Sequence, residues 1–311
     1  MSPEATPVQR ALPPVRGSLT PAAIAKLSSM ELRARTIVEG HYSGQHRSPY
    51  RGASVEFADH REYAPGDELR HLDWKVYGRT DRFYIKEYDA ETNLSAHLLL
   101  DASGSMNFAS AEITKLDYAR FLCAGLAYLA IRQRDAASLI TFDAQIRERL
   151  PALTKRAHLQ RIFETLDAVQ PGRDTNIAGI LEQVATTVTR RGIIVLVSDL
   201  LDEPEQVLRG LGYFRHRGHD VMLLHVMDPA ELQFSFRGPT LFEDLETGEK
   251  LLADAGQVRG EYLAAMREFL VTVRDGCRQR SIDYALLDTS QPYDEALVAY
   301  LGRREKAGRG R

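Results

Sequence analysis

The fold of this chain is decided by the stretch Leu98-Leu99-Leu100-Asp101-Ala102-Ser103-Gly104-Ser105-Met106, where an apolar run ends at an acid and two hydroxyl residues. A strand covered by helices on both faces is continuously aliphatic, so the run predicts a buried strand of an α/β sheet. Ligands bind at the carboxyl ends of such strands. Small residues around the acid leave the backbone free to turn, so that Asp101, Ser103 and Ser105 could point at one spot. Taken alone, the stretch is equally typical of a strand-to-turn junction in which Ser105 caps the next helix.

Strand and helix patterns alternate after this stretch. Apolar runs predict strands at 137–142, 193–197, 221–226 and 284–287, with an antiparallel edge strand at 146–150. Amphipathic patterns predict helices at about 116–130, 156–168, 177–189, 204–217 and 258–273. Such alternation is typical of βαβ units with right-handed crossovers. We therefore expect a doubly wound, mainly parallel sheet with helices on both faces over 93–290, and a hairpin insertion on its rim at 228–256 with Thr247-Gly248 in the turn.

The flanking segments have other patterns. Residues 1–19 are rich in proline and poor in aliphatic residues, which predicts a flexible tail. Residues 20–92 predict a smaller α+β extension, with one amphipathic helix from Thr20 to Gly40 followed by a region of short strands. Residues 291–311 predict a C-terminal helix and a basic tail.

Composition limits the function. The chain has 311 residues, 44% of them hydrophobic, and its 40 basic and 43 acidic side chains give a net charge of −3. The chain therefore has no net positive charge that would attract nucleic acid or anionic lipid. The two cysteines favour a reducing compartment over a disulfide framework. Because neither a signal peptide nor a run of about 18 apolar residues occurs, we expect no membrane insertion and a cytoplasmic location.

The segment His41 to Arg82 is the one candidate for a nucleic-acid surface, because it is rich in arginine and aromatic residues. Its seven arginine and lysine residues are, however, interleaved with seven acids. Such interleaving favours ion pairs within the segment over a stripe that binds phosphates. We therefore expect no nucleic-acid partner.

Two further residues extend the candidate metal site. Thr175 precedes a predicted helix after a loop, and Asp199 ends the apolar strand at 193–197. In a doubly wound sheet, these loops and the Asp101 loop meet at one edge. Hydroxyl and carboxylate oxygens suit a hard cation that prefers about six oxygen ligands. The sequence therefore predicts that Asp101, Ser103, Ser105, Thr175 and Asp199 bind Mg²⁺ (or Mn²⁺).

This five-part pattern resembles the metal-ion-dependent adhesion site of von Willebrand factor A domains. The resemblance covers about 93–288 and implies a von Willebrand A-like fold. It also implies that the two serines and the threonine approach the metal, that the aspartates often act through water, and that one position stays open for the acidic side chain of a partner protein.

A second resemblance covers nearly the whole chain. Four stretches carry it: 31–35, 54–67, Leu72-Asp73-Trp74-Lys75 with Arg79-Thr80, and 242–248 in the insertion. They are similar to the bacterial domain of unknown function family 58. Such proteins are commonly linked to MoxR-type AAA+ ATPases, and the resemblance therefore implies an adaptor or co-chaperone role with such an ATPase as partner.

Three functions follow as hypotheses. The first is a non-enzymatic protein-interaction module whose metal takes its last ligand from a partner. The second is a metal-dependent phosphate-ester hydrolase, for which Asp199 or Asp174 would have to act as general base. The third is nucleic-acid binding through 41–82. We favour the first, because no base or nucleophile is evident beside the predicted metal.

Overall fold

A computed structural model of the chain describes residues 20–44, 60–62, 77–78, 83–86, 94–172 and 174–309. Its centre is a six-stranded sheet in the order β10-β7-β6-β3-β4-β5. The strands are β3 (Ser95–Asp101), β4 (Ala136–Phe142), β5 (Ile146–Leu153), β6 (Ile193–Ser198), β7 (Asp220–Met227) and β10 (Asp283–Asp288). Neighbouring strands pair in parallel except for the edge strand β5, which is antiparallel to β4. The predicted doubly wound, mainly parallel sheet is therefore confirmed.

The strand order places a switch point beside the opening stretch. After β3 the chain continues to β4 on one side, and it later returns to β6 on the other side of β3. In the β3–β6 ladder Leu100 pairs with Val197, so Asp101 and Ser198 end neighbouring strands. A crevice that can hold a ligand opens where connections leave neighbouring strands in opposite directions.

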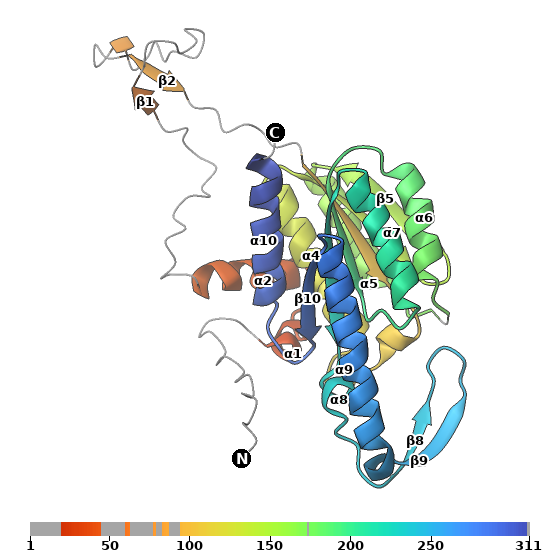
Figure 1. Ribbon diagram of the computed structural model, residues 1–311. Helices are drawn as coiled ribbons and strands as arrows, with labels where there is room; N and C mark the ends of the chain where they lie inside the picture. Colours follow the sequence, from red (N-terminus) through yellow and green to blue (C-terminus); the bar gives the residue numbers. More distant parts are fainter. Residues whose placement is uncertain are drawn as a thin grey trace, which may run out of the picture.

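Helices cover both faces of the sheet (Figure 1). One face packs against α4 (Lys115–Arg132), α5 (Arg156–Ala168) and α10 (Asp294–Arg309), and α2 (Met30–Gly44) packs on these helices with α1 (Pro21–Ala25) beside it. The other face packs against α6 (Ile177–Thr187), α7 (Pro204–His216) and α9 (Ala255–Gln279). Side chains alternate between these layers, since Leu98 and Leu100 lie in the first core and Leu99 in the second. This two-sided burial explains why the run in β3 is continuously aliphatic.

The N-terminal helix differs from its prediction. In place of one helix from Thr20 to Gly40, the structure has α1 and α2 with a bend between them. The Ser29 hydroxyl accepts a hydrogen bond from the Leu32 amide at 3.2 Å, so it caps the second helix. Serine competes with a helical backbone in this way, which explains the break.

Two later elements also refine the predictions. The rim hairpin consists of β8 (Pro239–Glu243) and β9 (Lys250–Asp254), which pair antiparallel, and Gly248 in its turn has a φ of +75°. A short helix, α8 (Pro229–Gln233), precedes it. The basic tail expected from Arg303 is instead the last part of α10. Arg304 anchors this part of the helix by an ion pair of 2.5 Å with the buried Asp135.

Parts of the N-terminal extension lie outside the described residues. These parts include the expected tail at 1–19, the strand expected at 54–57 and most of the interleaved charges of 41–82. Within the description, β1 (His60–Glu62) pairs antiparallel with β2 (Tyr84–Lys86). Among the described residues no helix combines the length and the apolar character needed to cross a bilayer.

Candidate metal centre

The polar side chains of the Asp101 loop are linked by local hydrogen bonds. Asp101 is fully buried, and its Oδ1 accepts a hydrogen bond from the Ser103 amide at 2.9 Å. The hydroxyls of Ser103 and Ser105 form a hydrogen bond, with their oxygens 3.1 Å apart. Oxygens at neighbouring positions of an octahedral Mg²⁺ shell lie about 2.9 Å apart, given bond lengths of about 2.05 Å. The two hydroxyls are therefore spaced as two ligands of one ion would be.

The end of β6 adds the second predicted acid. Ser198 donates a hydrogen bond from its hydroxyl to Asp101 Oδ2 at 2.6 Å, and Asp199 follows in the chain. Burial and then the nearby charge of Asp199 together raise the pKa of Asp101 to about 7, against the lowering effect of hydrogen bonds from Ser198 and Ser103. Two carboxyl groups thus share a dry site, an arrangement that a cation between them would stabilise.

Thr175 lies on a loop that is tied down at both ends. The Gly172 amide donates to the Ala102 carbonyl at 2.6 Å, and the Ile177 amide donates to Asp202 Oδ2 at 2.9 Å. These bonds hold the loop against the Asp101 loop and against the segment that follows β6. The Thr175 Oγ1 atom is buried and makes no hydrogen bond within the described part of the chain. A buried hydroxyl without a partner can accept a further interaction, which fits a role as metal ligand.

Lys115 is the main residue of this region that sequence reasoning missed. Its side chain is fully buried, and its Nζ lies 2.8 Å from Asp199 Oδ2 and 2.6 Å from Glu231 Oε1. Burial lowers the pKa of Lys115, but the two carboxylates raise it, and the net shift is upward. One oxygen of Asp199 is thereby committed to an ammonium group. A direct bond from that oxygen to a metal would require the lysine to move.

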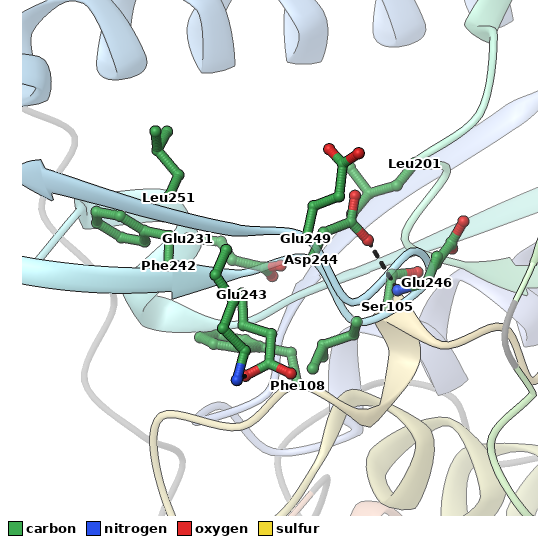
Figure 2. A pocket seen from close by; sticks show the side chains of 12 residues that line it. Ser105, Phe108, Leu201, Glu231, Phe242, Glu243, Asp244, Glu246, Glu249 and Leu251 are labelled. Carbon is green, nitrogen blue, oxygen red and sulfur yellow. Dashed lines mark hydrogen bonds and ion pairs between the residues drawn. The ribbon is translucent and has the colours of Figure 1, made fainter.

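Glu246 is the second residue that was missed. It lies at the tip of the rim hairpin and lines a pocket together with Ser105, as Figure 2 shows. Burial and the charge of Asp199 raise its pKa, and hydrogen bonding from Ser105 lowers it. Its Oε1 atom is buried without a hydrogen-bond partner among the described residues. The only sequence signal was the predicted rim position of the hairpin.

The donor set fits a hard cation. Two hydroxyls at ligand spacing and two buried carboxyl groups lie at the β3–β6 switch point, with Glu246 beside Ser105 and the Thr175 loop hydrogen-bonded to the Asp101 loop. Across the described residues, no group of three or more histidine, cysteine and acidic side chains is arranged to hold a metal. Hydroxyl-rich sites of this kind suit Mg²⁺ or Mn²⁺ better than Zn²⁺. The assignment of the five metal ligands nevertheless stays a prediction.

The fold and this region define a class of protein: a doubly wound α/β domain with a candidate cation site at its switch point. The chain belongs to the family described as "Protein of unknown function DUF58", whose model matches residues 59–270. The resemblance to this family that was seen in the sequence is thus confirmed. Uncharacterized proteins of Mycobacterium tuberculosis and Mycobacterium bovis are each 28% identical to it over 238 residues, which cover 75% of this chain and 74% of each relative.

Two solved structures are similar to this chain at low sequence identity. The conserved hypothetical protein BatB from Bacteroides thetaiotaomicron is similar at a TM-score of 0.48 and 16% identity, over 68% of this chain and 99% of that chain. The VWA domain of SpRpn10 is similar at a TM-score of 0.39 and 10% identity, over 66% of this chain and 94% of that chain.

Proposed function

We propose that this protein is a non-enzymatic interaction module in which Mg²⁺ or Mn²⁺ joins it to an acidic side chain of a partner protein. The metal ligands in this proposal are Asp101, Ser103, Ser105, Thr175 and Asp199. The observation that carries the proposal is the pair of serine hydroxyls, 3.1 Å apart beside the buried Asp101. The unpartnered Thr175 hydroxyl supports it, because a metal would supply the missing interaction.

In this proposal Asp199 binds the metal through a water molecule and not directly. Its Oδ2 is held by Lys115 at 2.8 Å, and its Oδ1 accepts a long hydrogen bond of 3.3 Å from the Leu201 amide. A carboxylate held in this way bonds a metal most readily through a water molecule, since a water bridges two groups without displacing either. The lysine also offsets part of the negative charge of the site.

The same contacts argue against a phosphate-ester hydrolase. A general base needs a free oxygen facing the water that it deprotonates, whereas Asp199 Oδ2 is paired with Lys115 and its Oδ1 accepts from the Leu201 amide. The other candidate base, Asp174, is exposed and makes no hydrogen bond to the site among the described residues. A binding role therefore agrees better with the contacts than hydrolysis does.

The partner follows from the family resemblance. We infer that a MoxR-type AAA+ ATPase presents the acidic side chain, with this chain as its adaptor or co-chaperone in the cytoplasm. No nucleic acid and no membrane insertion enter this proposal.

A binding experiment tests the proposed function. The unaltered chain and Asp101→Ala are each mixed with the MoxR-type ATPase of the same genome, with Mg²⁺ and then with a chelator. We expect retention of the unaltered chain in Mg²⁺, and loss of retention both in chelator and in the variant. Binding that neither the chelator nor the variant changes would exclude a metal-bridged contact.

A further inference from the structure

The tip of the rim hairpin directs one carboxylate at the candidate metal centre. A cavity of about 660 Å³ separates the hairpin from the sheet edge, and both Ser105 and Glu246 line it. Glu246 is partly buried there, whereas its neighbours Asp244, Leu245 and Glu249 are exposed. In Figure 2 Glu246 and Ser105 lie together at one end of this cavity. The hairpin thus places the carboxylate of Glu246 beside Ser105, a residue of the predicted ligand set.

The tip is locked in the conformation that makes this contact. Asp244 Oδ1 accepts hydrogen bonds from the backbone amides of Glu246 at 2.8 Å and Thr247 at 3.1 Å. The Gly248 amide also donates to the Asp244 carbonyl at 2.8 Å, and the positive φ of Gly248 closes the turn. A carboxylate that caps consecutive amides fixes the loop around it. The position of Glu246 is therefore built into the hairpin.

Among the described residues Glu246 makes no ion pair, and Lys250, which lines the same cavity, pairs with Glu243. The ammonium group of Lys115 already contacts two other acids, Asp199 and Glu231. One oxygen of Glu246 has no hydrogen-bond partner within the described residues, although it is buried. Asp199 lies near enough for its charge to disfavour ionisation of Glu246. Carboxylates brought together in this way are stabilised when a cation lies between them.

We propose that Glu246 is an internal ligand of the metal, and that it occupies the position which an acidic partner residue would otherwise take. This inference rests on the metal centre of the proposed function and adds a regulatory element to it. A partner carboxylate then competes with the hairpin for one coordination position. Binding of the partner requires the tip to move away, so the hairpin lowers the apparent affinity for the partner.

Glu246→Gln tests this role, and Glu249→Gln is the matched control. Glutamine keeps the size of the side chain but removes its charge, and Glu249 lies exposed on the same turn. Mn²⁺ affinity is measured by calorimetry on the full chain, and amide hydrogen exchange of residues 244–249 is measured with and without Mn²⁺. We expect the dissociation constant for Mn²⁺ to rise at least ~10-fold in E246Q and to stay unchanged in E249Q. We also expect Mn²⁺ to slow exchange at the tip of the unaltered chain and of E249Q, but not at the tip of E246Q.

The outcomes separate the two proposals. If Mn²⁺ binds the unaltered chain and E246Q equally well, or does not slow exchange at the tip, the internal ligand is excluded while the metal centre stands. If Mn²⁺ binds to neither protein, the metal centre itself is excluded, and the role of Glu246 falls with it.

Discussion

Lys115 is the residue on which the charge balance of the candidate site depends. It begins α4 on one face of the sheet, and it reaches Asp199 at the end of β6 and Glu231 in α8. Both of its ion pairs are largely buried, so water does not screen them. The lysine therefore connects three segments that are distant in the sequence.

Replacing this lysine should destabilise the fold. In Lys115→Met, the carboxylates of Asp199 and Glu231 lose their shared counter-charge, and breaking a buried ion pair costs about 3–5 kcal/mol. We expect a loss of that size in the free energy of unfolding, measured by urea denaturation at pH 7. Lys26→Met removes an exposed ion pair of 3.3 Å with Glu112 and should cost less than about 1 kcal/mol. Equal losses in both variants would contradict the account.

His97 should make the protein sensitive to acid. Burial lowers its pKa from 6.5 to about 4, and its Nδ1 lies 2.9 Å from the Ser138 hydroxyl. Between these two pH values the unfolded chain binds a proton that the folded chain does not, so the free energy of unfolding falls as the pH falls. The effect of His97 on the free energy of unfolding is small above pH 6.5. By pH 5 the titration of His97 lowers this free energy by about 2 kcal/mol.

Urea denaturation at pH 7.5 and pH 5 measures this effect in the unaltered chain and in His97→Gln. We expect the loss of stability on acidification to be about 2 kcal/mol smaller in the variant. An identical loss in both proteins would show that His97 is not buried in its neutral form.

The sequence could predict some residues of the candidate site for local reasons and others only through the fold. The cluster of Asp101, Ser103 and Ser105 follows from nine consecutive residues, and the expected position of Asp199 follows from the rule for parallel strand ends. Lys115 and Glu246 were missed because their partners lie in other elements, and no local pattern separates them from exposed residues of a helix start and a turn.

Among the elements, the sheet was the most predictable part. Runs such as 193–197 are fully apolar because helices cover both faces, and this pattern identifies a strand without tertiary information. Helix limits were less predictable. The bend near Ser29 depends on a side-chain cap, and the length of α10 depends on ion pairs of Arg303 and Arg304 with Asp220 and Asp135 in other parts of the fold.

A substitution at Gly192 tests how closely β6 approaches β3. A Cβ atom at this position would lie 2.3 Å from the Ser95 carbonyl oxygen, which belongs to the backbone and has little freedom to move. We expect Gly192→Ala to lower the free energy of unfolding by about 1–3 kcal/mol, because the strands must separate.

Gly260→Ala is the control for that measurement. Gly260 lies in α9, and a Cβ there would meet nothing within 4 Å. Alanine should therefore raise the free energy of unfolding by about 0.5–1 kcal/mol, since glycine is a poor helix former. Thermal or urea unfolding measures the stability of both variants. If Gly192→Ala were as stable as Gly260→Ala, the described strand packing would be contradicted.

At the scale of the whole molecule, the candidate site lies where the two halves of the sheet meet. The loops after β3 and β6 and the rim hairpin contribute to it, and the loop before α6 is hydrogen-bonded to the Asp101 loop. A ligand at this place binds only when these segments are assembled, and it therefore stabilises the folded chain as a whole.

Mg²⁺ should consequently raise the thermal stability. At a free Mg²⁺ concentration of 100 times the dissociation constant, the added free energy of unfolding is about 2.7 kcal/mol. Differential scanning calorimetry in Mg²⁺ and in chelator measures the shift in Tm. Equal Tm values in both buffers, at millimolar Mg²⁺, would contradict a metal that is part of the folded structure.

Calorimetric titration of Mg²⁺ tests the central claim most directly, when it is applied to the unaltered chain, Ser103→Ala and Ser290→Ala. Ser290 provides the control, because its exposed hydroxyl follows β10 and bonds only to Asp288 and Gln291 among the described residues. The account predicts one bound Mg²⁺ in the unaltered chain and in Ser290→Ala, with affinity reduced at least ~10-fold in Ser103→Ala. Equal binding in all three proteins, or no binding in any of them, would contradict a metal centre at the end of β3.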